Sequence, residues 1–156
     1  MVHIAFDLGL TTTGVAWPDG SDTHTCPAAL RRSPITPELE QQRLAWWQHT
    51  FNMILLPWRD ATIVIEAPFI HNRHPSGAMS LIMLHGVLRA VANDGCHPVH
   101  QVEPTVLKRW ATGNGGATKE QMMRTARQLG WEGVDHNEAD AFLLWTMWAG
   151  RNQDAA

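Results

Sequence analysis

The sequence predicts a mixed α/β fold in which helices cover one β-sheet. The chain begins with two short apolar runs separated by a turn rich in glycine and threonine (residues 2–17), which is the pattern of a β-hairpin. Further along, apolar strand-like runs alternate with segments of helical periodicity, as expected where helices connect parallel strands. The 156 residues suit one domain, and the contents of 44% apolar and 17% charged residues favour a folded globule.

The first predicted strand ends in a carboxylate. Asp7 follows the apolar residues 2–6, and burying a carboxylate without a partner is costly. Asp7 is therefore expected to cap the turn near solvent or to face a cation. Gly9 and Gly14 flank the threonines of the turn, where they permit a close approach that a side chain would block.

A third antiparallel strand is predicted within residues 21–29, where Pro27 restricts it to an edge or an end of the sheet. The loop that follows leads to a helix from Pro37 to about residue 56. Thr36 is the expected N-cap. Proline suits the first helical position because its missing N–H would have no partner there.

Residues 61–66 form the next predicted strand, which is β-branched, apolar on both faces and ends in Glu66. These features are typical of a central strand with parallel neighbours. Residues 67–77 are a predicted loop. The helix predicted over 78–92 is apolar around most of its circumference, so it is buried either within one chain or at a subunit interface.

The rest of the chain is predicted to contain one strand and three helices. Thr118 and Gln121 form a capping box that opens the second of these helices, and Gly130 closes it. The elements are a strand over 98–102, a short helix over 105–110 that is broken by the glycine-rich segment 113–116, a helix over 118–129 and a helix over 135–148.

Three acidic residues share one property, because each interrupts an otherwise apolar element at its end. Asp7 and Glu66 end two strands, and Asp140 lies in the first turns of the last helix. Open α/β sheets form their sites at strand ends, and carboxylates brought together there repel one another unless protons or cations separate them. Hard oxygen ligands select Mg²⁺ or Mn²⁺ over zinc. Two such ions, roughly 4 Å apart, would suit in-line hydrolysis of a phosphodiester.

The last helix also offers candidates for a fourth ligand or a general base. His136 and Asn137 lie four and three residues before Asp140 and share its face. Glu138 and Asp135 lie off that stripe, although Asp135 can precede the helix and bend back. The competing interpretation is an acid-rich first turn that only complements the helix dipole.

Three stretches resemble motifs of the RuvC-type Holliday-junction resolvases, a family within the RNase H-like superfamily. Residues 4–9 with Thr13 and Gly14 are similar to the family's first strand, and residues 64–69 to its second acidic strand, including an aromatic residue three positions after the glutamate. Residues 137–141 are similar to its C-terminal acidic motif, particularly in phage-type members. The motifs match in order and separation over essentially the whole chain, so the resemblance implies one RNase H-like nuclease domain over residues 1–156.

The resemblance implies a metal-dependent endonuclease that acts as a homodimer, with two sites that nick opposing strands of a four-way DNA junction. By position, the three acids at the element ends would be catalytic and would bind Mg²⁺ or Mn²⁺, two ions per site. The family commonly has Asp or His three residues before the last aspartate, where this chain has Asn137. His136 as a catalytic residue, or Asp135 as a metal ligand, would take over that position. The helix predicted over 78–92 would pack against its counterpart in the dimer.

Several residues are candidates for binding DNA. Phe69 lies where the family inserts an aromatic residue at the junction centre, and Arg73 lies in the same loop. Lys108 and Lys119 fall where the family has basic residues near the scissile phosphate and the DNA backbone, and Arg109 follows Lys108. An aromatic side chain in such a loop can stack on a base. The ordinary alternatives are a phenylalanine packed in the core and lysines in solvent.

Other classes of function fit the sequence less well. Actin-like and sugar-kinase ATPases begin with a similar motif but need a second domain, and the nine scattered histidines lack the cysteine partners of zinc sites. A less selective flap or branched-DNA nuclease, or a module that binds branched DNA without cutting it, remains open. The net charge of −3 does not decide whether the chain binds nucleic acid, because a cluster of carboxylates would mask a basic surface in the total.

A cytoplasmic protein without a membrane segment is expected. Cys26 and Cys96 are far apart in the sequence, which is typical of reduced proteins rather than disulfide scaffolds. The N-terminus has no signal-like pattern, and no apolar run approaches the length that crosses a bilayer.

Overall fold

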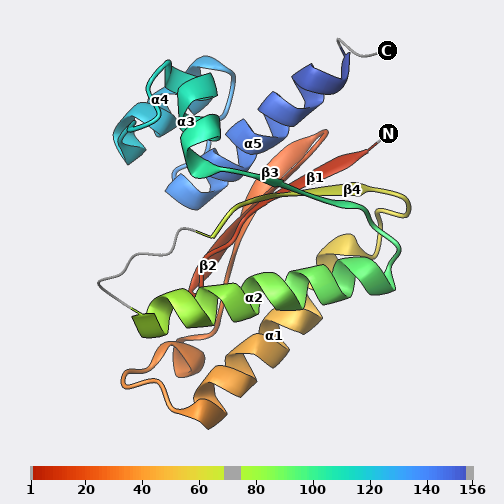
Figure 1. Cartoon of the computed structure of the whole chain (residues 1–156), viewed down its shortest axis with the longest axis vertical. Coiled ribbons are helices and arrows are strands. Elements are labelled where there is room, and N and C mark those ends of the chain that lie inside the picture. The colour runs from red at the N-terminus through yellow and green to blue at the C-terminus, as the bar shows by residue number, and fades with distance from the viewer. Residues whose placement is uncertain (1, 69–74, 154–156) are drawn as a thin grey trace.

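A five-stranded mixed sheet forms the centre of the fold (Figure 1), for which the computed structural model describes residues 2–68 and 75–153. Strand β2 pairs antiparallel with β1 and β3, whereas β4 runs parallel to both β1 and β5. The predicted mixed α/β class is therefore confirmed, as is the central, parallel position of β4. The strands, in the spatial order β3-β2-β1-β4-β5, are β1 (His3–Asp7), β2 (Thr12–Trp17), β3 (Gly20–Thr25), β4 (Thr62–Glu66) and β5 (Val99–Val102).

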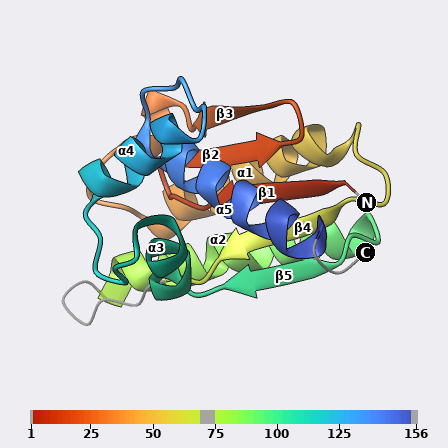
Figure 2. The same cartoon turned by 90° about the horizontal axis from the view of Figure 1, so that it is seen from above.

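Helices cover both faces of the sheet. Helices α1 (Pro37–Leu55) and α2 (Pro75–Asp94) lie on one face, and α3 (Pro104–Thr112), α4 (Lys119–Gln128) and α5 (His136–Gln153) lie on the other (Figure 1). A short 3-10 helix, η1 (Ala28–Arg31), follows β3. Seen from above, α5 crosses β1 and β2, and it packs against both (Figure 2). In the described part of the chain, none of the helices combines the length and the apolar character needed to cross a membrane.

The helix ends follow the predicted local signals. The hydroxyl of Thr36 accepts a hydrogen bond from the N–H of Leu39 at the start of α1. The capping box of Thr118 and Gln121 opens α4, and Gly113 ends α3 with a left-handed φ of 77°. These boundaries are confirmed because each depends on only a few neighbouring residues.

Three helices are longer than predicted. Helix α3 covers Pro104–Thr112 instead of 105–110. Helix α2 begins at Pro75, inside the predicted loop 67–77, because proline is well suited to the first turn of a helix. Helix α5 continues to Gln153, beyond the predicted end at residue 148. Strand β3 ends at Thr25, before Pro27, and lies at the edge of the sheet as predicted. Both Cys26 and Cys96 are free.

The alternation of side chains along β1 and β4 divides these strands between two apolar cores. Phe6 and Ile65 belong to the core between the sheet and the α1–α2 layer. Ala5 and Val64 belong to the core beneath α3, α4 and α5. All four residues are fully buried. The pleat therefore directs the last residue of each strand towards the α5 side of the sheet.

Helix α5 approaches β2 very closely at Gly14. A Cβ atom at this position would clash with the carbonyl group of Asn137 and would lie 2.7 Å from the amide nitrogen of Glu138. In the turn, a Cβ atom at Gly9 would clash with the carbonyl oxygen of Thr12. The close approaches predicted for both glycines are confirmed, and the one at Gly14 sets the position of the start of α5 over the sheet.

Substitution of Gly14 by alanine is expected to destabilise the protein by about 1–3 kcal/mol, because the added methyl group forces α5 away from β2. The melting temperature should fall by roughly 2–4 °C for each kcal/mol in a chain of this size. Thermal unfolding followed by circular dichroism measures the change. Gly150→Ala, in α5 itself, is the control: apart from its chain neighbours and the local helix backbone, no atom lies within 4 Å of its Cβ position, so it should not lower the melting temperature. Equal melting temperatures for Gly14→Ala and the wild type would contradict the close approach.

Candidate active site

Three carboxylates converge at one end of the sheet. The parallel register pairs Phe6 with Ile65, so the residues that follow on the two strands, Asp7 and Glu66, lie level with each other. The pleat directs both side chains to the α5 side. Asp140 lies one turn into α5, on the helix that crosses these strands. Residues far apart in the sequence are thereby brought together.

A cavity of about 710 Å³ contains all three carboxylates. It lies at the carboxyl ends of β1 and β4, with α2 on one side of the sheet and α3, α4 and α5 on the other. Lys108 and Lys119, which are the two lysines of the sequence, both line it. His136 and Asn137 line it as well. The cavity therefore combines acidic, basic and imidazole groups.

Burial raises the pKa values of all three carboxylates and is the largest cause for each, and repulsion from acidic neighbours adds to the shifts of Asp7 and Glu66. Burial, then the charges of Glu66 and Asp140, raise the pKa of Asp7 well above its usual range. Burial and the neighbouring Asp140 raise the pKa of Glu66 to about 7. Burial raises the pKa of Asp140 to about 6. Without a cation, the cavity holds protons near neutral pH.

The two lysines oppose these shifts. Lys119 lowers the pKa of Asp7, and both lysines lower that of Asp140. The Nζ atom of Lys119 also lies 2.8 Å from Nε2 of His136. An ammonium group only donates hydrogen bonds, so Nε2 is the unprotonated nitrogen of the ring. The charge of the lysines only partly compensates that of the acids.

The donor set of the cavity suits a hard divalent cation. Oδ1 of Asp140 is buried and has no hydrogen-bond partner in the described part of the chain, an arrangement that is costly for a carboxylate unless a cation satisfies it. Within residues 2–68 and 75–153, no three His, Cys, Asp or Glu side chains are grouped tightly enough to hold one ion. Mg²⁺ is often bound by one or two carboxylates, with waters and substrate phosphate oxygens as the remaining ligands. The carboxylates that line the cavity are ligands of this kind.

The candidates for a fourth ligand or a general base lie at the start of α5, and only some of them line the cavity. His136 and Asn137 face the cavity. Asp135 precedes the helix, and its Oδ1 accepts hydrogen bonds from the N–H groups of Asn137 (2.8 Å) and Glu138 (3.4 Å). Asp135 thus caps α5 and does not line the cavity, although its charge adds to the raised pKa of Asp7.

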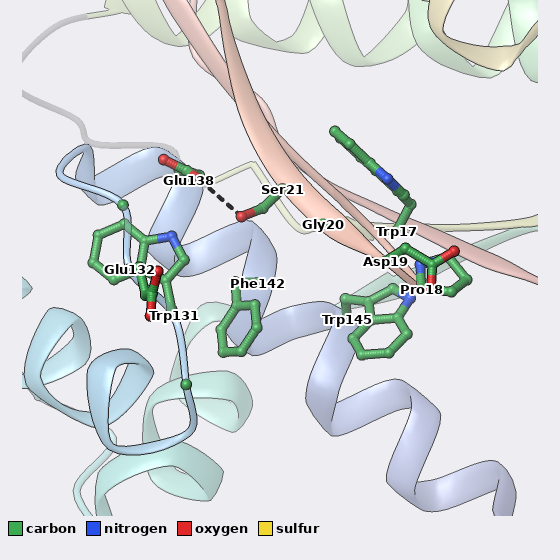
Figure 3. A pocket seen from close by; sticks show the side chains of 12 residues that line it. Trp17, Pro18, Asp19, Gly20, Ser21, Trp131, Glu132, Glu138, Phe142 and Trp145 are labelled. Atoms are coloured by element: carbon green, nitrogen blue, oxygen red, sulfur yellow. Dashed lines mark hydrogen bonds between the residues drawn. The ribbon is translucent and has the colours of Figure 1, made fainter.

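Glu138 points to the opposite side of α5, into a second hollow of about 500 Å³ (Figure 3). There it accepts a hydrogen bond of 2.7 Å from the hydroxyl of Ser21. Trp131, Phe142 and Trp145 also line this hollow, and none of the three converging carboxylates does. Glu138 is thereby separated from the cavity, as its position off the helix stripe predicts.

The predicted DNA contacts differ in their relation to the cavity. Lys108 and Lys119 line the cavity, as described above. Arg109 is exposed on α3 and does not line it. Phe69 and Arg73 lie outside the described residues.

Sequence reasoning missed two ionisable residues of the cavity, His85 of α2 and Glu103 at the start of α3. A histidine within the apolar run 78–92 was the signal for the first. Glu103 is exposed and follows the short strand β5, and no local pattern distinguishes it from other surface acids.

Solved structures identify the fold. RuvC from Thermus thermophilus is similar to this chain with a TM-score of 0.75, and T. thermophilus RuvC in complex with Holliday junction substrate has a TM-score of 0.77. Both are 19% identical in sequence, and the alignments cover 99% of this chain and 97% and 96% of those chains. The chain has the RuvC fold.

Curated sequences named crossover junction endodeoxyribonuclease RuvC are similar at higher identity. The one from Anaeromyxobacter dehalogenans (strain 2CP-C) is 36% identical over 104 residues, and the one from Anaeromyxobacter sp. (strain K) is 41% identical over 104 residues. Each match covers 66% of this chain and 56% of the relative, so the chain spans about half the length of the curated relatives it matches. No family model matches the sequence. The resemblance to RuvC-type resolvases is confirmed.

In the presence of a chelator, the contribution of Asp7, Glu66 and Asp140 to stability is expected to fall as the pH rises from about 4 to about 7. Acids with raised pKa values bind protons more tightly in the folded state, so their contribution is complete below the unfolded pKa and is lost as the pH passes the folded pKa. Glu66→Gln removes one such acid, so it should raise the melting temperature at pH 8 and not at pH 4. Thermal melts in EDTA test this.

Glu132→Gln changes an exposed glutamate and serves as the control, with no effect expected at either pH. If Glu66→Gln and the wild type have the same melting temperature at pH 8, the ionised Glu66 does not destabilise the folded protein, and the prediction is wrong.

Proposed function

We propose that this chain is a divalent-metal-dependent endodeoxyribonuclease that resolves four-way DNA junctions by hydrolysing one phosphodiester in each of two opposing strands. The observation that carries the proposal is the convergence of Asp7, Glu66 and Asp140 in a cavity that also contains two lysines. A DNA phosphate adds negative charge to this cavity, so its entry requires cations. Relatives named for cleavage of crossover junctions match two thirds of the chain, which supports this substrate.

The three carboxylates would hold Mg²⁺ or Mn²⁺, with two ions per site. When bound, such ions generate a hydroxide nucleophile and stabilise the leaving oxygen. The partnerless Oδ1 of Asp140 supports its role as a ligand. The raised pKa values of Asp7 and Glu66 support the same role, because a divalent cation would replace the protons that these acids otherwise retain.

Lys119 and His136 are proposed to act together. In the free protein, Nζ of Lys119 donates to Nε2 of His136. A phosphate oxygen is charged and accepts more strongly than a neutral imidazole, so bound DNA would draw the ammonium group away. Nε2 of His136 is then free to accept a proton from the attacking water. Lys108, from α3, would contact the same stretch of DNA backbone.

A homodimer is proposed to form through α2. Leu84 and Leu88 of this helix are fully buried within the chain, whereas Met79 and Ile82 are 58% and 39% exposed. Both interpretations of the apolar helix therefore find support: one face packs inside the protomer and another is available for a second copy. We infer that residues 1–156 form one nuclease domain per protomer, so that a dimer brings two sites to a junction.

A non-cleaving DNA-binding module is disfavoured by the site. Carboxylates beside phosphates weaken binding, so a module that only binds gains nothing from three of them. A less selective branched-DNA nuclease would use the same residues and would differ only in how the dimer and its loops fit the substrate.

The deciding experiment uses labelled four-way junction, Y-flap and linear duplex, each incubated with the protein in Mg²⁺, Mn²⁺ or EDTA. Cleavage of the junction alone is expected in the presence of either ion, with none in EDTA. Asp7→Asn should abolish cleavage and leave junction binding largely intact, since it disables the ion site without removing a basic contact.

Each alternative has its own outcome in this assay. Cleavage that persists in EDTA would exclude the proposed chemistry, and cleavage by Asp7→Asn would remove Asp7 from it. Equal cutting of the flap and the junction would favour the less selective nuclease. Binding of the junction by the wild type without cutting in either metal would favour the binding module.

Lys108→Ala should weaken junction binding and lower the slope of log Kd against log salt concentration by about 0.9, because one phosphate contact is lost. Fluorescence anisotropy at several NaCl concentrations and a constant Mg²⁺ concentration measures the slope, in the Asp7→Asn background so that the DNA stays uncut. Arg59→Ala removes an exposed cation that does not line the cavity, and it serves as the control. An unchanged slope for Lys108→Ala would place Lys108 off the DNA.

A further inference from the structure

His85 is a polar residue in the buried part of an apolar helix. It lies on α2, beside the fully buried Leu84, and it is only 6% exposed itself. It lines the cavity that contains the three carboxylates. The α1–α2 layer, on the other face of the sheet from α5 (Figure 1), thus contributes an imidazole to the site.

The hydrogen bonding of His85 is incomplete. Its Nδ1 atom is buried and has no hydrogen-bond partner in the described part of the chain. A neutral imidazole carries its proton on one nitrogen only. With the proton on Nδ1, an N–H group would be buried without an acceptor, which is costly. The proton therefore belongs on Nε2, the nitrogen left to face the cavity.

The imidazole of His85 is uncharged at neutral pH. Burial, and then the guanidinium of Arg89, lower the pKa of His85 to about 4. A neutral donor differs from the two lysines of the cavity, because it forms a directional hydrogen bond without forming an ion pair with the nearby acids.

We propose that His85 is a positioning residue that donates a hydrogen bond from Nε2 to a phosphate oxygen of the DNA in the cavity. It approaches from the α2 side, whereas Lys108 and Lys119 approach from α3 and α4. A phosphate held from both layers is fixed in orientation as well as in place, which in-line hydrolysis requires. This inference rests on the proposed nuclease function and deepens it.

The test compares His85→Leu with His85→Gln. Leucine fills the site without a donor, whereas the longer amide of glutamine can place an N–H group near the position of Nε2. Junction binding is measured in the Asp7→Asn background, where the DNA stays uncut, and cleavage rates are measured with Asp7 intact. His85→Leu should weaken binding about tenfold without changing its salt slope, because it removes a hydrogen bond to a charged group and no charge. His85→Gln should recover most of the loss.

Melting temperatures separate DNA binding from folding. If His85 only fills space, the more apolar leucine should bind and cut like the wild type, and that result would overturn the inference. Weakened binding in both variants at unchanged melting temperatures would overturn the donor role of Nε2. If His85→Leu fails to fold, His85→Asn takes its place. Its shorter amide reaches the position of Nδ1 only, so it should lose binding where glutamine retains it.

The two proposals fail in different ways. A wild-type protein that neither binds nor cuts the junction refutes the proposed function and this inference together. A wild type that binds and cuts, with His85→Leu indistinguishable from it, refutes the role of His85 alone.

Discussion

Three carboxylates with no cation between them repel one another, and the fold holds them together despite that repulsion. Burial raises the pKa values of Asp7, Glu66 and Asp140 above their usual range, and the charges of acidic neighbours raise those of Asp7 and Glu66 further. Such a site opposes folding at neutral pH. The two cores on the faces of the sheet compensate, since the residues that precede the acids on β1 and β4, Phe6 and Ile65, are fully buried. The two strand-end acids, Asp7 and Glu66, thus follow directly on fully buried core residues.

The arrangement of positive charge shows why the cavity suits a bound cation and substrate. Two ammonium groups face three acids, and one of them, that of Lys119, is also hydrogen-bonded to His136. The buried Oδ1 of Asp140 has no donor in the described part of the chain. Electrostatic balance is therefore incomplete in the free protein. Under the proposed function, ions and phosphate enter together, because each offsets the charge that would exclude the other.

The sequence could predict the features that neighbouring residues determine, and not those that depend on contacts between distant parts of the chain. The strand ends at Asp7 and Glu66 follow from apolar periodicity, and the caps at Thr36 and Thr118 follow from a few neighbouring residues. The pleat, which has a period of two, then determines that both strand-end acids face α5. Helix spacing also separates His136, on the face of Asp140, from Glu138. The contact of Glu138 with the hydroxyl of Ser21 could not be predicted in the same way, because it depends on the rotation of α5, which the contact at Gly14 fixes across more than a hundred residues of sequence.

His85 was missed for a related reason. Its proposed role depends on the cavity at the end of the sheet, which helices from both faces of the sheet line. Helix α2 presents His85 to the cavity and Ile82, three residues earlier, to solvent. Three residues advance a helix by about 4.5 Å, so the proposed dimer surface and the cavity lie within one turn of the same rigid element. If two copies meet through α2, the separation of their active sites is set by helix packing and not by loops. A fixed separation is what paired cuts in a branched duplex require.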